Sequence, residues 1–169
     1  QKRRDSRIVA AITEQALETY LIDNQTGFYR LAYSYLRSRE DALDAVQTAV
    51  CRALEQRGAL RQREALRTWF YRILTNVCTD MLRGRKRVLF VTEEALNTGS
   101  YEDPDPADSL EDQISQLPPE IQTVIRLRFY EQLSLAEIAE ATGWNLSTVK
   151  TRLYSGLKKL RIAMEGEDV

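Results

Sequence analysis

The amino-acid sequence predicts an all-α protein with two helical domains joined by an acidic, flexible linker. Of its 169 residues, 43% are hydrophobic, and only 7 are glycine and 4 are proline, a composition that suits helices packed around real cores. Apolar residues recur at helical spacing through most of the chain. Residues 88–112 interrupt this pattern with the runs Asn-Thr-Gly-Ser and Asp-Pro-Asp-Pro, which cannot continue a helix, and their eight Asp or Glu without any Lys or Arg repel one another. We therefore expect domains at residues 1–87 and 113–169, with the linker between them.

The first domain is expected to contain four helices, of which the first two cover residues 5–23 and 28–36. The third helix begins at Ser38, which forms an S-x-x-D capping signal with Asp41. Its apolar residues share one face of the helix and are predicted to be buried: Leu43, Val46, Val50 and Leu54.

Residues 57–65 break the helical period at Gly58 and are expected to form a loop. A fourth helix is expected over residues 66–82, where a broad apolar stripe includes Trp69, Phe70, Ile73, Leu74, Val77, Cys78 and Met81. A basic cluster follows directly: Arg83, Arg85, Lys86 and Arg87. Such a cluster suits DNA phosphates, although cations at a helix end also complement the helix dipole.

The second domain is expected to open with a helix whose first position is a proline, within residues 117–120. The core face of this helix consists of Ile121, Val124, Ile125, Leu127 and Phe129.

Residues 133–161 carry local signals in the order of a helix-turn-helix motif. Ser134 and Glu137 form a capping box, Gly143 supplies a left-handed residue, and Asn145 or Ser147 can cap the next helix. One face of that helix is predicted to be buried: Val149, Leu153, Leu157 and Leu160. Small hydroxyl residues and cations occupy the other face, which suits a DNA major groove and its phosphates.

Charge is strongly segregated although the net charge is only −1. Residues 1–87 carry +7, residues 88–112 carry −8, and residues 113–169 are neutral with their cations concentrated on one helix. This distribution favours a nucleic-acid partner for the two helical domains, while the acidic linker should stay off DNA.

Several classes of protein are disfavoured. The chain has no histidine, no glycine-rich phosphate loop and no metal-ligand spacing, so we expect neither an enzyme nor a cofactor. Two distant cysteines, Cys51 and Cys78, are expected to be buried thiols. We see no signal peptide or membrane span, and we expect a cytoplasmic protein.

Three segments resemble bacterial extracytoplasmic-function (ECF, group IV) RNA polymerase sigma factors of the sigma-70 family. They are residues 39–54 (REDALDAVQTAVCRAL), residues 66–87 (LRTWFYRILTNVCTDMLRGRKR) and residues 117–161, which include the helix-turn-helix. Their order, with a variable acidic connector between them, is typical of that family.

The resemblance implies that the third helix docks on the β′ coiled coil of core RNA polymerase through Asp44 and Gln47. Thr48 stands where the family usually has an acidic residue, and Cys51 borders the same ridge. The β flap is the second implied contact with polymerase.

The resemblance further implies that the fourth helix and the loop before it open the −10 promoter element and hold an unstacked base. The residues at these positions are Arg61, Arg63, Trp69, Tyr71, Asn76, Asp80, Arg83, Arg85, Lys86 and Arg87. For Trp69 and Tyr71 a place in the core competes with this role. The second helix of the helix-turn-helix is implied to read the −35 element through Ser147, Thr148, Lys150, Thr151, Arg152, Ser155 and Lys158.

The implied partners are core polymerase, promoter DNA and an anti-sigma factor, commonly membrane-tethered, with no small-molecule substrate. Because every segment already has a use, we expect the chain to be switched from outside, by a partner wedged between its domains. Two alternatives are a stand-alone helix-turn-helix regulator with an N-terminal dimerisation or ligand domain, and a helical adaptor that binds only proteins. The Asp44–Gln47 ridge disfavours the first alternative, and the basic recognition face disfavours the second.

Overall fold

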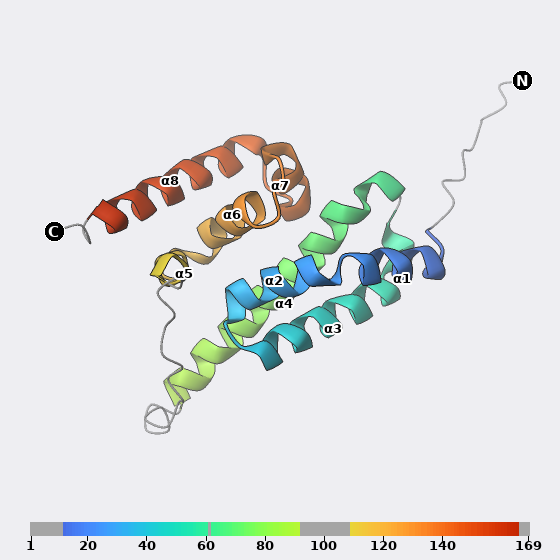
Figure 1. Ribbon diagram of the computed structural model, residues 1–169. Helices are drawn as coiled ribbons and strands as arrows, with labels where there is room; N and C mark the ends of the chain where they lie inside the picture. Colours follow the sequence, from blue (N-terminus) through green and yellow to red (C-terminus); the bar gives the residue numbers. More distant parts are fainter. Residues whose placement is uncertain (1–11, 61, 92–108, 166–169) are drawn as a thin grey trace, which may run out of the picture.

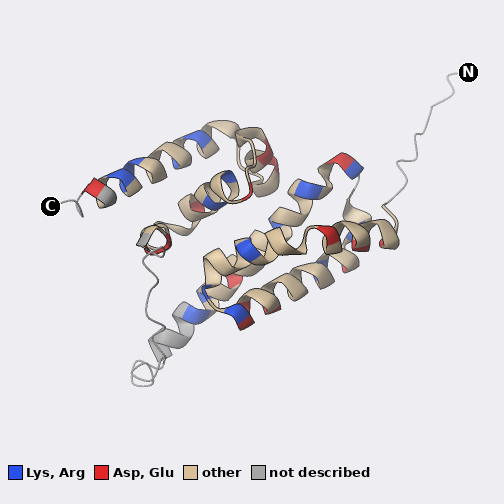
Figure 2. Cartoon of the chain, viewed as in Figure 1, with Lys and Arg blue, Asp and Glu red and all other residues tan. Residues whose placement is uncertain are grey.

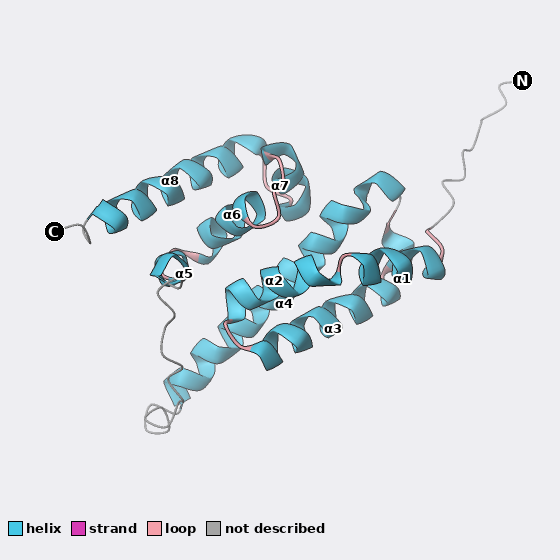
Figure 3. Ribbon diagram, viewed as in Figure 1, coloured by secondary structure: helices cyan, strands magenta, loops and turns pink. Residues whose placement is uncertain are grey.

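The computed structural model describes residues 12–60, 62–91 and 109–165, without the side chains of residues 86–91, 109 and 164. Within these residues every regular element is a helix (Figure 3), which confirms the all-α prediction. Figure 1 shows the helices in two groups that lie against each other, α1–α4 and α5–α8.

The first domain is built from α1 (Glu14–Asp23), α2 (Gln25–Leu36), α3 (Arg39–Glu55) and α4 (Leu66–Val91). The predicted start of the first helix, at residues 5–11, lies outside the described residues. Phe28 on α2 anchors the core, with its ring centroid 4.4 Å from that of Phe70 on α4. Ser38 caps α3 as predicted, because its hydroxyl accepts a hydrogen bond from the backbone N–H of Asp41.

Helix α3 buries a different face from the one that we predicted. Its buried residues are the alanines Ala42, Ala45, Ala49 and Ala53, whereas the side chain of Leu43 is 48% exposed. Val46, Val50 and Leu54 are only partly buried. Small residues let α3 lie close to both α2 and α4, while the larger Val46, Val50 and Leu54 pack at the edge of the core and Leu43 lies in solvent.

The segment between α3 and α4 is not an irregular loop throughout, because it contains two short 3₁₀ turns, Arg57–Ala59 and Arg63–Ala65. Helix α4 then continues to Val91, well past the predicted end at residue 82, and takes the basic cluster into the helix. Arg85 donates a hydrogen bond to the carbonyl of Leu36 (2.7 Å) and forms an ion pair with Asp41, so it ties α4 to the turn between α2 and α3.

The two cysteines differ in their exposure to solvent. Cys78 is buried as predicted, and burial raises the pKa of its thiol to about 12. Cys51 is exposed, and the prediction that it is buried is wrong. It lies one turn after Gln47, on the outer face of α3, opposite the alanines.

The second domain contains α5 (Ser109–Ser115), α6 (Pro119–Phe129), α7 (Leu135–Thr142) and α8 (Leu146–Glu165). Pro119 stands at the start of α6 as predicted. Helix α5 was not predicted, since its first four residues, 109–112, had been assigned to the acidic linker. Two of its acidic residues form ion pairs: Glu111 with Arg126, and Asp112 with Arg37 of the first domain.

Helices α6 and α8 lie very close together at Gly156. A Cβ atom at this position would lie 2.7 Å from Cγ2 of Ile121 and 3.1 Å from Cδ1 of Ile125, so only glycine fits without movement. Val149, Leu153 and Leu160 are buried as predicted, but Leu157 and Phe129 are 37% and 56% exposed. Phe129 is the last residue of α6, where the helix has already passed the core.

The two domains share one continuous apolar core, and α4 packs directly on α7. Polar contacts also cross the boundary, including a hydrogen bond of 2.7 Å between the hydroxyls of Tyr35 on α2 and Thr123 on α6. The segment that connects the domains, residues 92–108, lies outside the described residues. The prediction that the linker is flexible concerns this same segment.

Candidate nucleic-acid and protein interfaces

Helix α3 presents a ridge on its outer face. Asp44, Gln47 and Cys51 are exposed, and Thr48 is half-buried beside them. These positions are three or four residues apart, so they lie along one side of the helix and could meet a partner helix. Leu43 belongs to the same exposed side, with an apolar surface that sequence reasoning had placed in the core. The alternative alanine pattern at residues 42, 45, 49 and 53 was the signal that could have identified the buried face.

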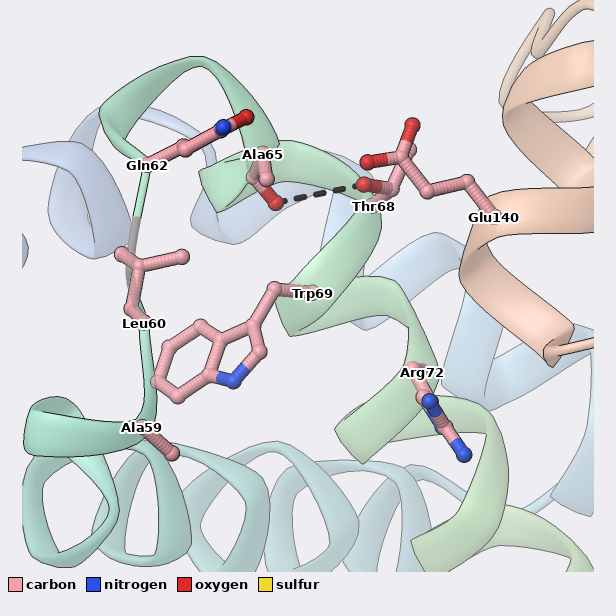
Figure 4. Close-up of a pocket in the computed structure, with 8 residues that line it drawn as sticks. All are labelled: Ala59, Leu60, Gln62, Ala65, Thr68, Trp69, Arg72 and Glu140. Atoms are coloured by element: carbon pink, nitrogen blue, oxygen red, sulfur yellow. Dashed lines mark hydrogen bonds between the residues drawn. The ribbon is translucent and has the colours of Figure 1, made fainter.

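A cavity of about 290 Å³ opens beside the start of α4. Figure 4 shows the indole of Trp69 along one wall, with Leu60 and Ala59 next to it. The hydroxyl of Thr68 donates to the carbonyl of Ala65 (3.2 Å), which holds the turn before α4 against the helix. Sequence reasoning identified Trp69 but missed the polar residues around the cavity: Gln62, Thr68, Arg72 and Glu140. Glu140 comes from α7 of the second domain, a long-range neighbour that no local pattern reveals.

The other residues assigned to the −10 element divide into three groups. Arg63, Asn76, Asp80 and Arg83 are exposed, and Asp80 lies 3.6 Å from Arg83 and 4.0 Å from Arg52. Arg85 is half-buried and is committed to its contacts with Leu36 and Asp41, so it is a structural residue in this arrangement. Arg61 and the side chains of Lys86 and Arg87 lie outside the described residues.

Among the residues assigned to the −10 element, Tyr71 lies in the position that differs most from an exposed contact with DNA. Its side chain is only 5% exposed and packs edge-on against Phe28, with 5.7 Å between ring centroids. Its hydroxyl donates a hydrogen bond of 2.5 Å to Glu131 of the second domain. Burial and the neighbouring carboxylate raise the pKa of the Tyr71 hydroxyl, so this group stays a hydrogen-bond donor at neutral pH. In this arrangement Tyr71 serves the domain boundary.

The helix-turn-helix forms as its local signals predict. Ser134 and Glu137 make the complete capping box, and their backbone and side-chain bonds lower the pKa of Glu137. Gly143 ends α7 with a φ angle of 78°, in the left-handed region. Of the two candidate caps for α8, the structure selects Asn145, whose Oδ1 accepts from the backbone N–H of Thr148 at 2.8 Å.

The outer face of α8 brings together most of the residues that we expected to read DNA. Ser147, Lys150, Thr151 and Lys158 are exposed, and Thr148 and Ser155 are half-buried. Lys and Arg recur along this helix in Figure 2. Tyr154 is 66% exposed and adds an aromatic surface that was not among the assigned residues. The face therefore offers hydroxyls for base edges and cations for phosphates.

Arg152 does not join this face. Its guanidinium lies 4.1 Å from the ring centroid of Trp144, in the turn of the motif. Its buried Nη1 atom has no hydrogen-bond partner among the described residues. The stacked guanidinium braces the turn against α8, which differs from the expected contact with phosphate.

Comparisons with known proteins match two separate parts of the chain to two family models. The family model for sigma-70 region 2 matches residues 21–88, and the model for sigma-70 region 4 matches residues 107–160. The chain is 40% identical to RNA polymerase sigma factor SigV of Bacillus subtilis over 93% of its length and 96% of the relative's. It is 30% identical to the ECF RNA polymerase sigma factor SigW of the same organism, with 79% and 80% covered.

The chain belongs to the ECF sigma factors of the sigma-70 family. It is therefore an RNA polymerase sigma factor, which directs promoter-specific initiation of transcription.

The fold of this sigma factor also resembles solved structures. One is the sigma factor RpoE from Bartonella quintana in complex with the anti-sigma factor NepR, with a TM-score of 0.72, 19% identity and coverage of 89% and 98% of the two chains. Another is CnrH in complex with the cytosolic domain of CnrY, with a TM-score of 0.70, 18% identity and 92% of each chain covered. Among the described helices, none is long and apolar enough to cross a lipid bilayer. The same residues contain no group of His, Cys, Asp and Glu side chains arranged to hold a metal ion.

Proposed function

We propose that this group IV sigma factor works through three separate surfaces and has no catalytic role of its own. The α3 ridge docks on the β′ coiled coil of core polymerase, the cavity beside α4 engages the −10 element, and the outer face of α8 reads the −35 element. A contact between the second domain and the β flap completes the docking. Since polymerase works on chromosomal DNA, the protein would act in the cytoplasm. The domain limits 1–87 and 113–169 are part of the proposal, except that the second domain is extended back to Ser109 so that it contains the whole of α5.

The α3 ridge suits a helical partner because its exposed side carries both apolar and polar side chains. Leu43 supplies apolar area, while Asp44 and Gln47 supply an acceptor and an amide within one turn of it. Such a combination gives both buried area and orientation when two helices meet.

The cavity beside α4 suits an unstacked base. An indole face offers stacking, and the side chains of Gln62 and Thr68 offer hydrogen-bonding groups at its edge. Exposed Asn76 continues this surface along α4, and Arg63 and Arg83 can meet phosphates. A double helix is too wide for this cavity, so the proposal requires that the element is opened.

The observation that carries the proposal is the placement of these surfaces on different helices of one small chain. A repressor needs a DNA-reading helix, but it needs neither an exposed ridge on α3 nor a cavity with an indole wall. In vitro transcription with purified core polymerase is the direct experiment, and promoter-dependent transcripts are expected only when the chain is added. Tight operator binding by an isolated dimer, without activity on polymerase, would instead identify a stand-alone regulator.

The docking ridge can be tested separately. The double variant Asp44→Arg and Gln47→Ala should lose capture by core polymerase in a pull-down assay while its thermal melt stays unchanged, because both side chains are exposed. Glu18→Arg is a matched control, since it also replaces a negative by a positive charge, at an exposed position on α1. Equal capture of both variants would mean that the ridge is misplaced.

An anti-sigma factor, membrane-tethered as is common in the family, is the proposed regulator. Two solved proteins share this fold: RpoE was solved in complex with the anti-sigma factor NepR, and CnrH in complex with the cytosolic domain of CnrY. Because the two domains already touch, a partner that wedges between them must first separate them. Co-purification from the native host, followed by competition with core polymerase, tests this proposal. Recovery of only free and active protein would contradict it.

A further inference from the structure

Helix α8 begins with an exposed leucine that is not among the residues assigned to the −35 element. Leu146 is the first residue of the helix and is 43% exposed. In most places on a protein surface a single exposed leucine needs no explanation. This one lies at the N-terminal end of the second helix of a helix-turn-helix, which is the end whose residues meet base edges. An apolar side chain therefore stands among the groups that we propose to read DNA.

The start of α8 is fixed by contacts within the motif. The Oδ1 atom of Asn145 accepts from the backbone N–H of Thr148 at 2.8 Å and from the hydroxyl of Ser147 at 3.0 Å. The guanidinium of Arg152 stacks on Trp144, with 4.1 Å to the ring centroid, and this ties the helix to the turn before it. The first residue of the helix is therefore held in a defined position before DNA binds.

Leu146 belongs to a ridge along the outer face of α8. Residues four apart on a helix are neighbours, so the ridge continues through Lys150, Tyr154 and Lys158. All four side chains are exposed, and they alternate between apolar and cationic. Cations suit the phosphates that border a major groove. The apolar group that a base pair presents within that groove is the methyl group of thymine.

A second ridge beside the first carries hydroxyl groups whose protons are already used. Ser147 donates its hydroxyl proton to Asn145, and Thr151 donates its own to the carbonyl of Ser147 at 2.9 Å. A hydroxyl that has donated its one proton can only accept further hydrogen bonds. In the major groove the amino groups of adenine and cytosine are donors, whereas guanine presents acceptors alone. These two hydroxyls therefore suit adenine or cytosine.

The two ridges together fit an A·T pair. Such a pair displays the amino group of adenine and the methyl group of thymine in the same groove, whereas a G·C pair has no methyl group there. Residues 146–158 contain no Asn, Gln, Asp or Glu, so the usual amide and carboxylate readers of bases are missing from this stretch of the sequence. Its one arginine, Arg152, is stacked on Trp144 in the turn. Contact with the methyl group is then a main source of discrimination between bases.

We propose that Leu146 is a specificity-determining residue of this sigma factor, and that it contacts the 5-methyl group of a thymine in the −35 element. The contact deepens the proposed assignment of the outer face of α8 to the −35 element, on which it rests. It names the chemical group that is read, and it adds to the reading surface a residue outside the assigned set. Lys150 and Lys158, on the same ridge, serve the phosphates.

The test compares thymine with deoxyuridine, which lacks only the methyl group. The probe is the duplex that wild-type holoenzyme, made from core polymerase and the full chain, enriches most strongly from a library of randomised sequence. Each thymine of its −35 element, on either strand, is replaced in turn by deoxyuridine. Affinity is measured by fluorescence anisotropy in the cold, before the duplex opens. At one position the loss of the methyl group should weaken binding about fourfold, the effect of returning one methyl-sized group to water.

Leu146→Ala removes the proposed reader of the methyl group. It should weaken binding to the thymine probe by at least about fourfold, and it should bind the thymine and deoxyuridine probes equally well. Leu110→Ala is the matched control, because Leu110 on α5 is the same residue type with the same 43% exposure. The control should keep the difference between the two probes that the wild type shows. Capture of core polymerase should be equal for all three proteins.

Three results would overturn the role of Leu146. The first is a wild type that binds every deoxyuridine probe as well as thymine, a comparison that needs no variant. The second is an equal loss on deoxyuridine for the wild type and Leu146→Ala. The third is weaker capture of core polymerase by Leu146→Ala, which would place Leu146 in a protein contact. Failure of the proposed function differs from all of these, because exchange of the whole −35 element for an unrelated sequence would then leave wild-type binding unchanged.

Discussion

Replacing Gly156 by alanine should destabilise the second domain, and the size of the effect follows from the geometry. The added Cβ would lie 2.7 Å from Cγ2 of Ile121, whereas carbon atoms in ordinary contact are about 3.5–4.0 Å apart. Helices α6 and α8 must therefore move apart by about 1 Å, because the branched side chain of Ile121 is stiff at χ1. Overpacking of this kind costs about 1–3 kcal/mol. Against this, Gly→Ala within a helix gains about 1 kcal/mol.

Gly84→Ala isolates the strain from the gain in helix propensity. Gly84 lies within α4, and a Cβ there meets no atom within 4 Å, so this variant should be more stable than the wild type. Gly156→Ala should then be about 1–3 kcal/mol less stable than Gly84→Ala. In urea unfolding followed by circular dichroism, this is a midpoint difference of about 0.5–1.5 M at an m-value near 2 kcal/mol/M.

A second-site change completes this test. Ile121→Leu removes Cγ2 at nearly constant volume, and should recover part of the stability lost in Gly156→Ala. Equal unfolding midpoints for Gly156→Ala and Gly84→Ala would show that α6 and α8 are not in such close contact.

Three further predictions concern the second domain. Arg152→Lys should lower the thermal stability of the domain almost as much as Arg152→Ala, because an ammonium cannot replace the guanidinium plane on Trp144; wild-type stability of Arg152→Lys would contradict the stacking role. Ser134→Ala should cost about 1 kcal/mol through the lost capping box, and Ser134→Asp should cost less in the same urea assay. Burial raises the pKa of Glu131, which faces Tyr20, Arg30, Arg67 and Tyr71, so the folded chain binds this proton more tightly than the unfolded chain. The free energy of unfolding should therefore increase as pH falls from 7 toward 5, with a smaller increase in Glu131→Gln; an equal change of the urea midpoint in the wild type and in Glu131→Gln would contradict this.

The parts of the structure that the sequence predicted correctly depend on local interactions. Ser38, Pro119, Ser134 and Gly143 each act within one helical turn, and each occupies its expected position. The hydroxyl and basic face of α8 is also local, because it follows from the helical period once the buried face is known.

The predictions that failed depend on partners far away in the sequence. The aliphatic residues of α3 outrank its alanines in hydrophobicity, but the close approach of α2 and α4 decides which face is buried. For Tyr71 the sequence left both a place in the core and a contact with DNA open, and only its hydrogen bond to Glu131, 60 residues later, places its side chain at the domain boundary. Acidic residues of α5 resembled a linker because Arg37 and Arg126, their partners, lie in other helices.

The alanine face of α3 has a consequence for how such proteins diversify. Because the fully buried residues of this helix are all alanines, and Leu43, Asp44, Gln47 and Cys51 are exposed, these four outer residues can be exchanged without a change in the interior. If the α3 ridge docks on polymerase as proposed, then substitutions on this face change the polymerase contact and leave the stability of the domain unchanged. A library of variants at residues 43, 44, 47 and 51 could therefore yield sigma factors that serve an altered polymerase in a cell that keeps its own, each folding as well as its parent.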